Sequence, residues 1–420
     1  MSSQADTVQS NGLEAHGHLD DGRVHQWRGP SKRGAFRAMV QDFSPLWFTW
    51  CMNAGIIAIL MHQEPYQFWG LGVLSTIAFL ADFVFFIFFS IIMLLRLILF
   101  RRQAYHELVG DTSELTLLAC WPVAWLTLTA FVALNVSGSS WGGHHFTIVA
   151  YVMWWIGAAW MLATLLFVFI ALIRRRTLAE QPLPPTILIP TVGLTTVATI
   201  GGVVSTYSTA ISARMAVPVI ITSFCFVGLG LFMALIFYAQ ILQQLLHKGW
   251  PQPEQTATLF VLVGPMGQGS AALQLLGSAA STYGRFAGYN KGSFLTEAAG
   301  PPLEMACVLI ALLLTGISVI GLVLALYAMF ERAFNKELTW APTWNSIIFP
   351  TGTLATSFLY FSMEMDSPFF RTMMTILLLF MISVFFLNLA FTAWKISQGQ
   401  ILVVREDPRM KQDGDDQKQR

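Results

Sequence analysis

The chain has 420 residues, of which 55% are hydrophobic and only 11% are charged, and its net charge is +1. Soluble domains carry about 25% charged residues, so this composition excludes an ordinary soluble protein. The near-neutral charge gives no indication of a nucleic-acid partner. The four cysteines all lie in apolar stretches without paired spacing, so neither a disulfide nor a metal site is predicted, and no cofactor is expected.

The two ends of the chain differ from its middle. Residues 1–40 are polar and lack the apolar core of a signal peptide, and residues 399–420 are also polar. Both ends are predicted to be flexible cytoplasmic tails. They flank a membrane domain that is expected to cover residues 41–398.

Between the tails, apolar stretches predict ten transmembrane helices. Each stretch is long enough to cross a bilayer, which takes roughly 20 residues. The fold class is therefore an all-α polytopic membrane protein. The expected spans are 45–62, 69–98, 115–134, 147–173, 186–205, 215–243, 258–280, 303–330, 344–362 and 372–395.

Lysine and arginine are distributed unevenly between the two sides of these spans. With the N-terminus inside, all but four of the 24 fall on the inner side. Inner loops are enriched in basic residues, so both termini are predicted to be cytoplasmic. Two of the four outer exceptions, Arg285 and Lys291, could attract anions to an outer mouth or be ordinary solvated charges. The other two are Arg214 and Arg371.

The odd-numbered spans share a feature that the even-numbered spans lack. The first carries Asn53-Ala-Gly55 at mid-depth, and the other four have an interior proline. In lipid, the backbone groups that a proline frees need protein or a water-filled cavity. The alternation predicts a helical hairpin used five times, with odd helices around a central pore and even helices facing lipid or neighbours. The alternative is that these residues serve only helix packing. The prolines are Pro122, Pro190, Pro265 and Pro350.

The ninth span carries the sharpest of these breaks, Ile-Ile-Phe-Pro-Thr-Gly-Thr over residues 347–353. A bulky ring, a helix breaker, two hydroxyls and a glycine follow one another there. Phe349, next to the break, could close a pathway. Packing is the alternative role, since the chain has 33 phenylalanines.

Three of the odd spans resemble helices of a known family. Leu259–Ser270, with its Gly-Pro-Met-Gly-Gln-Gly core, closely resembles the seventh helix of fungal sulfite efflux pumps, members of the tellurite-resistance/dicarboxylate transporter family. Residues 344–353 and 43–55 resemble the ninth and first helices. The resemblance extends from about Phe43 to Trp394 and leaves out the tails. The family also includes malic acid transport proteins and plant slow anion channels.

The resemblance implies a fold of five hairpins, a central pore of odd helices and a homotrimer with one pore per subunit. It also implies that a phenylalanine of the ninth helix plugs the pore; by motif position this is Phe349. The implied function is export of small anions across the plasma membrane, with sulfite as the leading substrate. A dicarboxylate such as malate, or another organic acid, is the alternative. Two motifs depart from the family pattern: Trp121-Pro-Val-Ala replaces Phe/Tyr-Pro-Met-Gly, and Met52-Asn-Ala-Gly replaces Met-Gly-Thr-Gly.

The candidate pathway residues of the odd spans include no basic residue at mid-depth. An anion would therefore be attracted by the positive ends of half-helices and by neutral donors. Weak binding of this kind suits conduction, because the ion must also leave. The candidates are Asn53, Gly55, Pro122, Pro190, Thr191, Gly264, Pro265, Gly267, Gln268, Ser270, Pro350, Thr351 and Thr353.

Asp82 is the one acid well inside an expected span. Intramembrane acids are costly and are functional hypotheses by default, so Asp82 is a candidate for proton coupling. A buried structural role is favoured, because Asp82 lies on an even helix. A membrane enzyme would need convergent His, Asp or Cys residues at membrane depth, and His144-His145 lies in a loop. The chain is therefore predicted not to be an enzyme, with no catalytic or metal site.

Overall fold

The computed structural model describes residues 34–175 and 183–402, and within these ranges the chain is helical, with one isolated bridge between Lys291 and Leu295 and no strand. Most of the two expected tails lies outside the described residues. Ala35–Gln41, at the end of the first expected tail, form helix α1, which buries Ala38 and Val40. These residues are therefore part of the packed domain.

Nine helical segments in the described ranges are long and apolar enough to cross a membrane. The expected ninth span is formed by a 3-10 segment, η7, followed by the 17-residue helix α13, and it is not among these nine. The nine contain α2, α3, α6, α7, α8, α9, α10, α12 and α14, and they cover Pro45–Gln63, Leu71–Leu99, Thr112–Val136, Gly143–Arg174, Pro185–Tyr207, Ala213–Lys248, Pro253–Ala280, Glu297–Phe334 and Pro368–Ser397.

The breaks predicted from proline are present. At each, a short or 3-10 segment is followed by a regular α-helix that has proline as its second or third residue. Proline is tolerated there because the first N–H groups of a helix have no intrahelical partner. The pairs are α5 (Thr112–Leu117) with α6 (Cys120–Phe131), η4 (Pro185–Leu188) with α8 (Ile189–Tyr207), η5 (Pro253–Val263) with α10 (Gly264–Ala280), and η7 (Pro342–Ile347) with α13 (Ile348–Glu364). In the first span, η1 (Pro45–Trp47) precedes α2 (Phe48–Gln63).

Burial divides the long helices into two sets. In the most apolar window of each span, 72% to 100% of the residues are buried for α2, α6, α8 and α10, against 28% to 39% for α3, α7, α9, α12 and α14. Residues 348–362 of α13 are all buried as well. We call α2, α6, α8, α10 and α13 the inner helices, and α3, α7, α9, α12 and α14 the outer helices.

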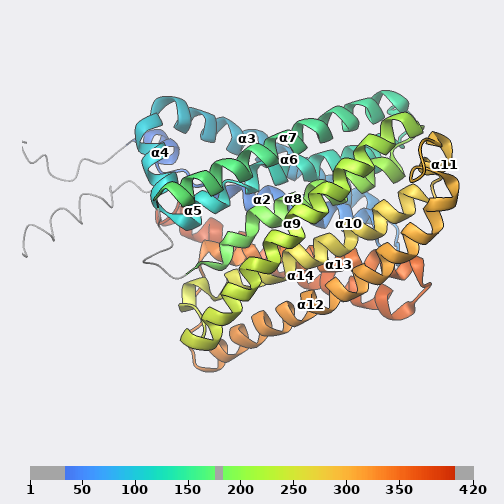
Figure 1. Cartoon of the computed structure of the whole chain (residues 1–420). Coiled ribbons are helices and arrows are strands. Elements are labelled where there is room, and N and C mark those ends of the chain that lie inside the picture. Colours follow the sequence, from blue (N-terminus) through green and yellow to red (C-terminus); the bar gives the residue numbers. More distant parts are fainter. Residues whose placement is uncertain (1–33, 176–182, 403–420) are drawn as a thin grey trace, which may run out of the picture. The chain divides into compact units, whose positions relative to one another are not determined.

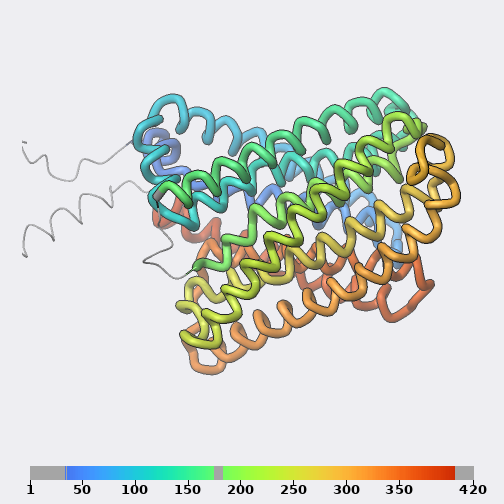
Figure 2. Tube along the Cα trace, in the orientation of Figure 1, coloured from blue at the N-terminus to red at the C-terminus, as the bar shows by residue number. Residues whose placement is uncertain are grey.

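The inner helices contact one another in a closed ring. α2 contacts α6, α6 contacts α8, α8 contacts α10, α10 contacts α13, and α13 returns to α2. Each inner helix also contacts the next outer helix of the chain: α3, α7, α9, α12 and α14, respectively. The long helices run side by side along a common direction, and α9 passes in front of the inner helices in the view of Figure 1. The trace in Figure 2 follows the chain through the same arrangement.

Close approach between these helices depends on small residues. A Cβ atom added at Gly55 of α2 would lie 2.5 Å from the Thr127 Cβ atom of α6 and 2.5 Å from an Asp82 carboxylate oxygen of α3. A Cβ atom at Gly352 of α13 would lie 2.6 Å from Ile56 Cγ1 of α2. Helices in lipid associate by such packing, because lipid tails are as apolar as their side chains. The glycines thus allow the ring to close.

Candidate functional site

A small cavity lies where the breaks of the inner helices meet. Every inner helix, or the 3-10 segment before it, contributes lining residues, and these lie close to the start of each α-helix. The ring therefore has all five helix starts at one end. The lining residues are Thr49, Met52, Asn53, Cys120, Ile189, Val192, Val261, Asn345, Ser346, Phe349 and Pro350.

The cavity is narrow, and Phe349 forms part of its wall. Its volume is about 30 Å³, enough for roughly two water molecules, since one needs about 10–15 Å³. The Phe349 side chain is 3% exposed. The ring of inner helices is thus closed at the level of the breaks.

Asn53 joins α2 to the break before α13. Its Nδ2 atom donates a hydrogen bond to the backbone oxygen of Asn345 at 3.0 Å, and its Oδ1 atom accepts one from the backbone N–H of Phe349 at 3.1 Å. The side chain is fully buried. One amide therefore satisfies both a carbonyl of η7 and an N–H group at the start of α13, which the break leaves without helical partners.

The predicted pathway threonines direct their hydroxyl protons back to their own segments. Thr191 donates to the carbonyl of Leu188 at 2.7 Å, Thr351 to that of Ile347 at 2.6 Å, and Thr353 to that of Pro350 at 2.7 Å. A hydroxyl has a single proton to donate. In this arrangement these side chains therefore stabilise the broken backbone.

Of the predicted site residues, the cavity brings together Asn53, Phe349 and Pro350. Gly264 lies nearby, since a Cβ atom there would be 2.7 Å from Val192 and 3.8 Å from Pro350. The remaining candidates are also buried but do not line the cavity: Gly55, Pro122, Pro190, Thr191, Pro265, Gly267, Gln268, Ser270, Thr351 and Thr353.

Two of these candidates, Gln268 and Ser270, lie on α10 and contact neighbouring helices away from the narrow cavity. The backbone oxygen of Gln268 accepts a hydrogen bond from Thr199 of α8 at 3.1 Å, while its Oε1 atom has no partner within the described ranges. Ser270 lies in a buried cluster of hydroxyls, 2.9 Å from Thr315 of α12 and 2.6 Å from Ser357 of α13. Gln274, one turn further along α10, donates to the same cluster.

The opposite end of the inner helices holds a wider cavity of about 250 Å³. Its wall carries three phenols, of Tyr207, Tyr283 and Tyr360, with the carboxylate of Glu364 and the amide of Gln274. α8, α10 and α13 contribute the residues near their C-terminal ends. The smaller cavity therefore lies at the breaks, and the larger one lies beside the C-terminal ends of three of the five inner helices.

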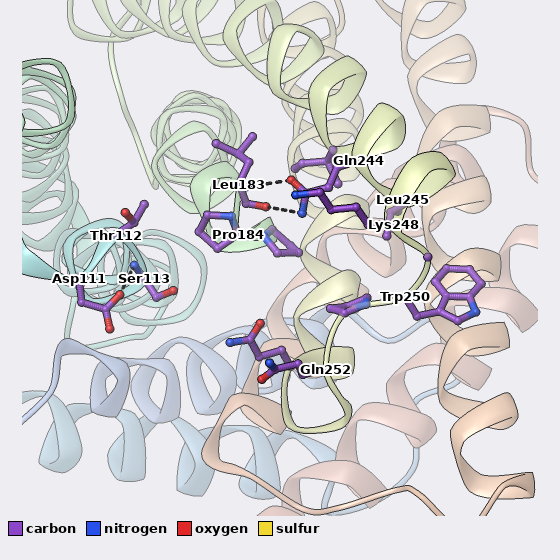
Figure 3. A pocket seen from close by; sticks show the side chains of 15 residues that line it. Asp111, Thr112, Ser113, Leu183, Pro184, Gln244, Leu245, Lys248, Trp250 and Gln252 are labelled. Carbon is purple, nitrogen blue, oxygen red and sulfur yellow. Dashed lines mark hydrogen bonds between the residues drawn. The ribbon is translucent and has the colours of Figure 1, made fainter. Parts of the chain in front are cut away.

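Two further cavities lie at the end where the inner helices start. One, of about 200 Å³, shares Asn345 with the narrow cavity and includes Ser44 and Glu114, which are hydrogen bonded at 2.6 Å. The other, of about 440 Å³, lies between α5, η4, α9 and η5 (Figure 3). Gln244 spans part of its wall, accepting from the Leu183 N–H at 2.8 Å and donating to the Leu183 carbonyl at 3.3 Å.

Asp82 reaches from the outer helix α3 into the space between inner helices. Its Oδ2 atom accepts a hydrogen bond from Thr127 of α6 at 3.0 Å, and its Oδ1 atom has no partner in the part of the chain that the structure describes. Asp82 is fully buried beside Gly55. It does not line any of the four cavities described above.

Arg285 is held by backbone at the wide end of the ring. Its Nε atom donates to the Ser205 carbonyl at 2.9 Å and its NH1 group to the Ile211 carbonyl at 2.8 Å. Burial lowers the pKa of the guanidinium from its ordinary value. Arg285 thus joins α11 (Arg285–Tyr289) to the end of α8. Lys291 instead lies over the ring of Tyr289, 5.3 Å from its centroid.

Sequence reasoning missed most of the residues that line the narrow cavity. It concentrated on prolines and the residues after them, whereas the lining comes largely from residues on the N-terminal side of each break. A signal was present in the pattern: these residues lie within five positions of the proline of a break, or within four positions before Asn53. They are Thr49, Met52, Cys120, Ile189, Val192, Val261, Asn345 and Ser346.

These features define a class: a multi-pass helical membrane protein with a closed ring of broken helices. Residues 42–393 match the voltage-dependent anion channel (SLAC1) family, and the chain belongs to this family. It is 27% identical over 360 residues to the sulfite efflux pump SSU1 of Trichophyton rubrum, and 26% identical to that of Arthroderma otae; both alignments cover 85% of this chain and 91% of the relative. An uncharacterized transporter of Methanocaldococcus jannaschii is 24% identical over 76% of this chain and 83% of its own length. The chain is therefore a transmembrane anion transporter or channel of this family.

Proposed function

We propose that this protein exports small anions through a pathway inside the ring of inner helices, and that the Phe349 side chain gates this pathway. One observation carries the proposal: the broken starts of all the inner helices meet around a narrow cavity whose wall includes Phe349. A structural bundle would not need to interrupt four neighbouring helices at one level, since each break gives up backbone hydrogen bonds.

In this proposal the chain crosses the plasma membrane ten times as five hairpins, with α13 as the ninth span and both termini in the cytoplasm. The pairing of each inner helix with the next outer helix supports the hairpins, and the distribution of Lys and Arg supports the orientation. Anions then enter where the inner helices start and leave past the wide cavity. The protein assembles as a homotrimer with one pathway in each subunit, as the family resemblance implies.

The helix starts supply the attraction for the anion. The N-terminus of a helix carries a partial positive charge and unpaired N–H groups. The starts of α6, α8 and α13, and the segment η5 before α10, contribute lining residues to the narrow cavity, and its walls include no Lys or Arg residue among those described. Binding at such a site is weak, so that an anion that passes Phe349 also leaves. The glycines and hydroxyls beside the breaks complete this pathway.

Sulfite is the substrate that we propose first, because the Gly-Pro-Met-Gly-Gln-Gly segment and the relatives named as sulfite efflux pumps both favour it. An organic acid such as malate is the second candidate. The wide cavity favours it, since about 250 Å³ lined by three phenols and an amide has room and donors for a larger anion.

The test is transport by the purified protein in liposomes loaded with sulfite, with malate or with chloride. We expect sulfite to leave the vesicles at least tenfold faster than from protein-free liposomes, which corresponds to about 1.4 kcal/mol in the barrier. Faster efflux of malate than of sulfite would select the second candidate. Potassium efflux as fast as that of the anions would overturn the proposed function.

A further inference from the structure

The strongest unassigned feature is the double hydrogen bond of Asn53 to the break beside Phe349. Both polar atoms of the amide are used, at 3.0 Å to the Asn345 carbonyl and 3.1 Å to the Phe349 N–H group. The two bonds hold both sides of the same break to α2. They fix the backbone position of Phe349, and through it the direction of the Cα–Cβ bond that carries the ring.

The break is also held from its other side. The Asn345 side chain accepts a hydrogen bond through Oδ1 from Nδ2 of Asn388 on α14 at 3.2 Å, and Oδ1 of Asn388 accepts one from the Trp340 indole at 3.2 Å. Asn53, Asn345 and Asn388 are each buried, with exposures of 0% to 2%. Buried amides of this kind are costly unless paired, so the chain of three specifies one arrangement of the segment.

We propose that Asn53 is a positioning residue that holds the Phe349 gate closed, with Asn345 and Asn388 supporting the same segment from the outer side. The proposal rests on the proposed role of Phe349. The phenyl ring of Phe349 lines the narrow cavity, while the backbone around it is held to α2 by the two hydrogen bonds of Asn53, which we call the clamp. Release of the clamp lets residues 345–349 shift, and the phenyl ring then moves away from the cavity more often.

The residue type at position 53 supports this assignment. The side-chain amide of asparagine carries both a donor and an acceptor. One residue therefore binds the Asn345 carbonyl and the Phe349 N–H group at once, and these two bonds set how readily the gate opens.

The experiment measures anion efflux from liposomes that contain wild type, Asn53→Leu, Phe349→Ala or the double variant. Leucine has the same number and branching of side-chain heavy atoms as asparagine, so the change removes the hydrogen bonds without opening a hole. The matched control is Ser75→Ala, which removes another buried hydrogen bond to α2, from Ser75 Oγ to the Ala58 carbonyl at 2.8 Å, away from the break.

We expect Asn53→Leu to raise basal efflux about tenfold, which corresponds to about 1.4 kcal/mol and fits the loss of two buried hydrogen bonds. Ser75→Ala is expected to leave efflux unchanged. In the Phe349→Ala background, Asn53→Leu is expected to cause no further rise in efflux, because Asn53 acts only by positioning the phenyl ring of Phe349. A purely structural role for Asn53 would change efflux equally in both backgrounds.

If Asn53→Leu has wild-type efflux while Phe349→Ala leaks, the proposed role of Asn53 is wrong, and the proposed gating by Phe349 still holds. A full additive effect in the double variant would overturn it too. Unchanged efflux from Phe349→Ala would instead overturn the proposed gate itself. If Asn53→Leu does not fold, Asn388→Leu decides: we expect a rise of about threefold for the loss of one supporting bond, and no rise contradicts the proposal.

Discussion

The inner and outer helices of this protein differ in burial and in where their backbone is interrupted. The outer helices are continuous and keep many large hydrophobic side chains exposed, such as Phe232 and Ile320, which are 71% and 62% exposed. The inner helices are almost wholly buried, yet they carry the breaks, the buried hydroxyls and the close-packed glycines. The costly features of the sequence are therefore concentrated where protein, and not lipid, surrounds the backbone.

This difference indicates what the breaks are for. A break on an outer helix would expose unpaired backbone groups to lipid, at several kcal/mol for each group. On the inner helices a neighbouring helix can satisfy a freed group, as when Asn53 of α2 accepts a hydrogen bond from the N–H group of Phe349. The ring thus keeps polar backbone at membrane depth, as an ion pathway requires.

The largest effect is expected for phenylalanine. Phe349→Ala on inner helix α13 should raise basal anion efflux by more than tenfold, because the phenyl ring of Phe349 is part of the wall of the narrow cavity. Phe232→Ala on outer helix α9 removes an equal side chain from an exposed position and should leave efflux within about twofold of wild type. Efflux from liposomes measures both, and equal rates for the two variants would contradict the division of roles.

Glycine gives the next comparison. Gly55→Ala should lower the free energy of unfolding by about 1–3 kcal/mol, because the added Cβ atom would meet Thr127 and Asp82 at 2.5 Å. Gly316→Ala on α12 meets no described atom within 4 Å, and it should be neutral or stabilising by up to about 1 kcal/mol. Thermal unfolding in detergent measures both. A Gly55→Ala protein as stable as wild type would show that the inner helices are less tightly packed than described.

A smaller loss of stability is expected at Arg285. Arg285→Gln should lower the free energy of unfolding by about 1 kcal/mol, since it weakens hydrogen bonds to two carbonyls at the end of α8. Anion efflux should change by less than about twofold, because the guanidinium is held by backbone. Lys291→Gln serves as the control, as its ammonium lies over Tyr289. A large fall in efflux with unchanged stability would favour the anion-attracting role instead.

The smallest effect is expected at Asp82, an outer-helix residue that reaches between inner helices. Asp82→Asn should retain the pH dependence of anion transport, because Asp82 contacts Thr127 and Gly55 and lies outside the cavities described. The amide can keep the hydrogen bond from Thr127. Transport measured from pH 5 to pH 8, roughly the range in which a proton-coupled step would respond, tests this. A flattened profile in the variant would assign proton coupling to Asp82.

Much of this division could be predicted from the sequence. Charge-free stretches located the helices, and Pro122, Pro190, Pro265 and Pro350 located the breaks, because proline acts on its own helix whatever the surroundings are. The helices found by length and apolarity agree with nine of the expected spans to within several residues at each end. The remaining expected span is the ninth, which consists of the 3-10 segment Pro342–Ile347 and the 17-residue helix α13.

The residues that line the narrow cavity were harder to predict from the sequence than the helices and their breaks. Which face of an inner helix points toward the ring centre depends on its neighbours: Gly55 faces Asp82 and Thr127, while Asn53, two residues before it, faces the break. The hydroxyls of Thr351 and Thr353 could not be assigned either, because a threonine in a broken helix can donate to its own backbone or to an ion. Hydrogen-bond partners that lie about 300 residues apart in the chain, such as Asn53 and Phe349, leave no local pattern.

We propose above that the inner helices enclose an anion pathway that Phe349 closes. The most direct test is the reversal potential of the Phe349→Ala protein in a planar bilayer with a potassium chloride gradient. We expect a current far above that of Phe232→Ala, and we expect it to reverse close to the chloride equilibrium potential. A current that reverses close to the potassium equilibrium potential, or no increase in current, would contradict it.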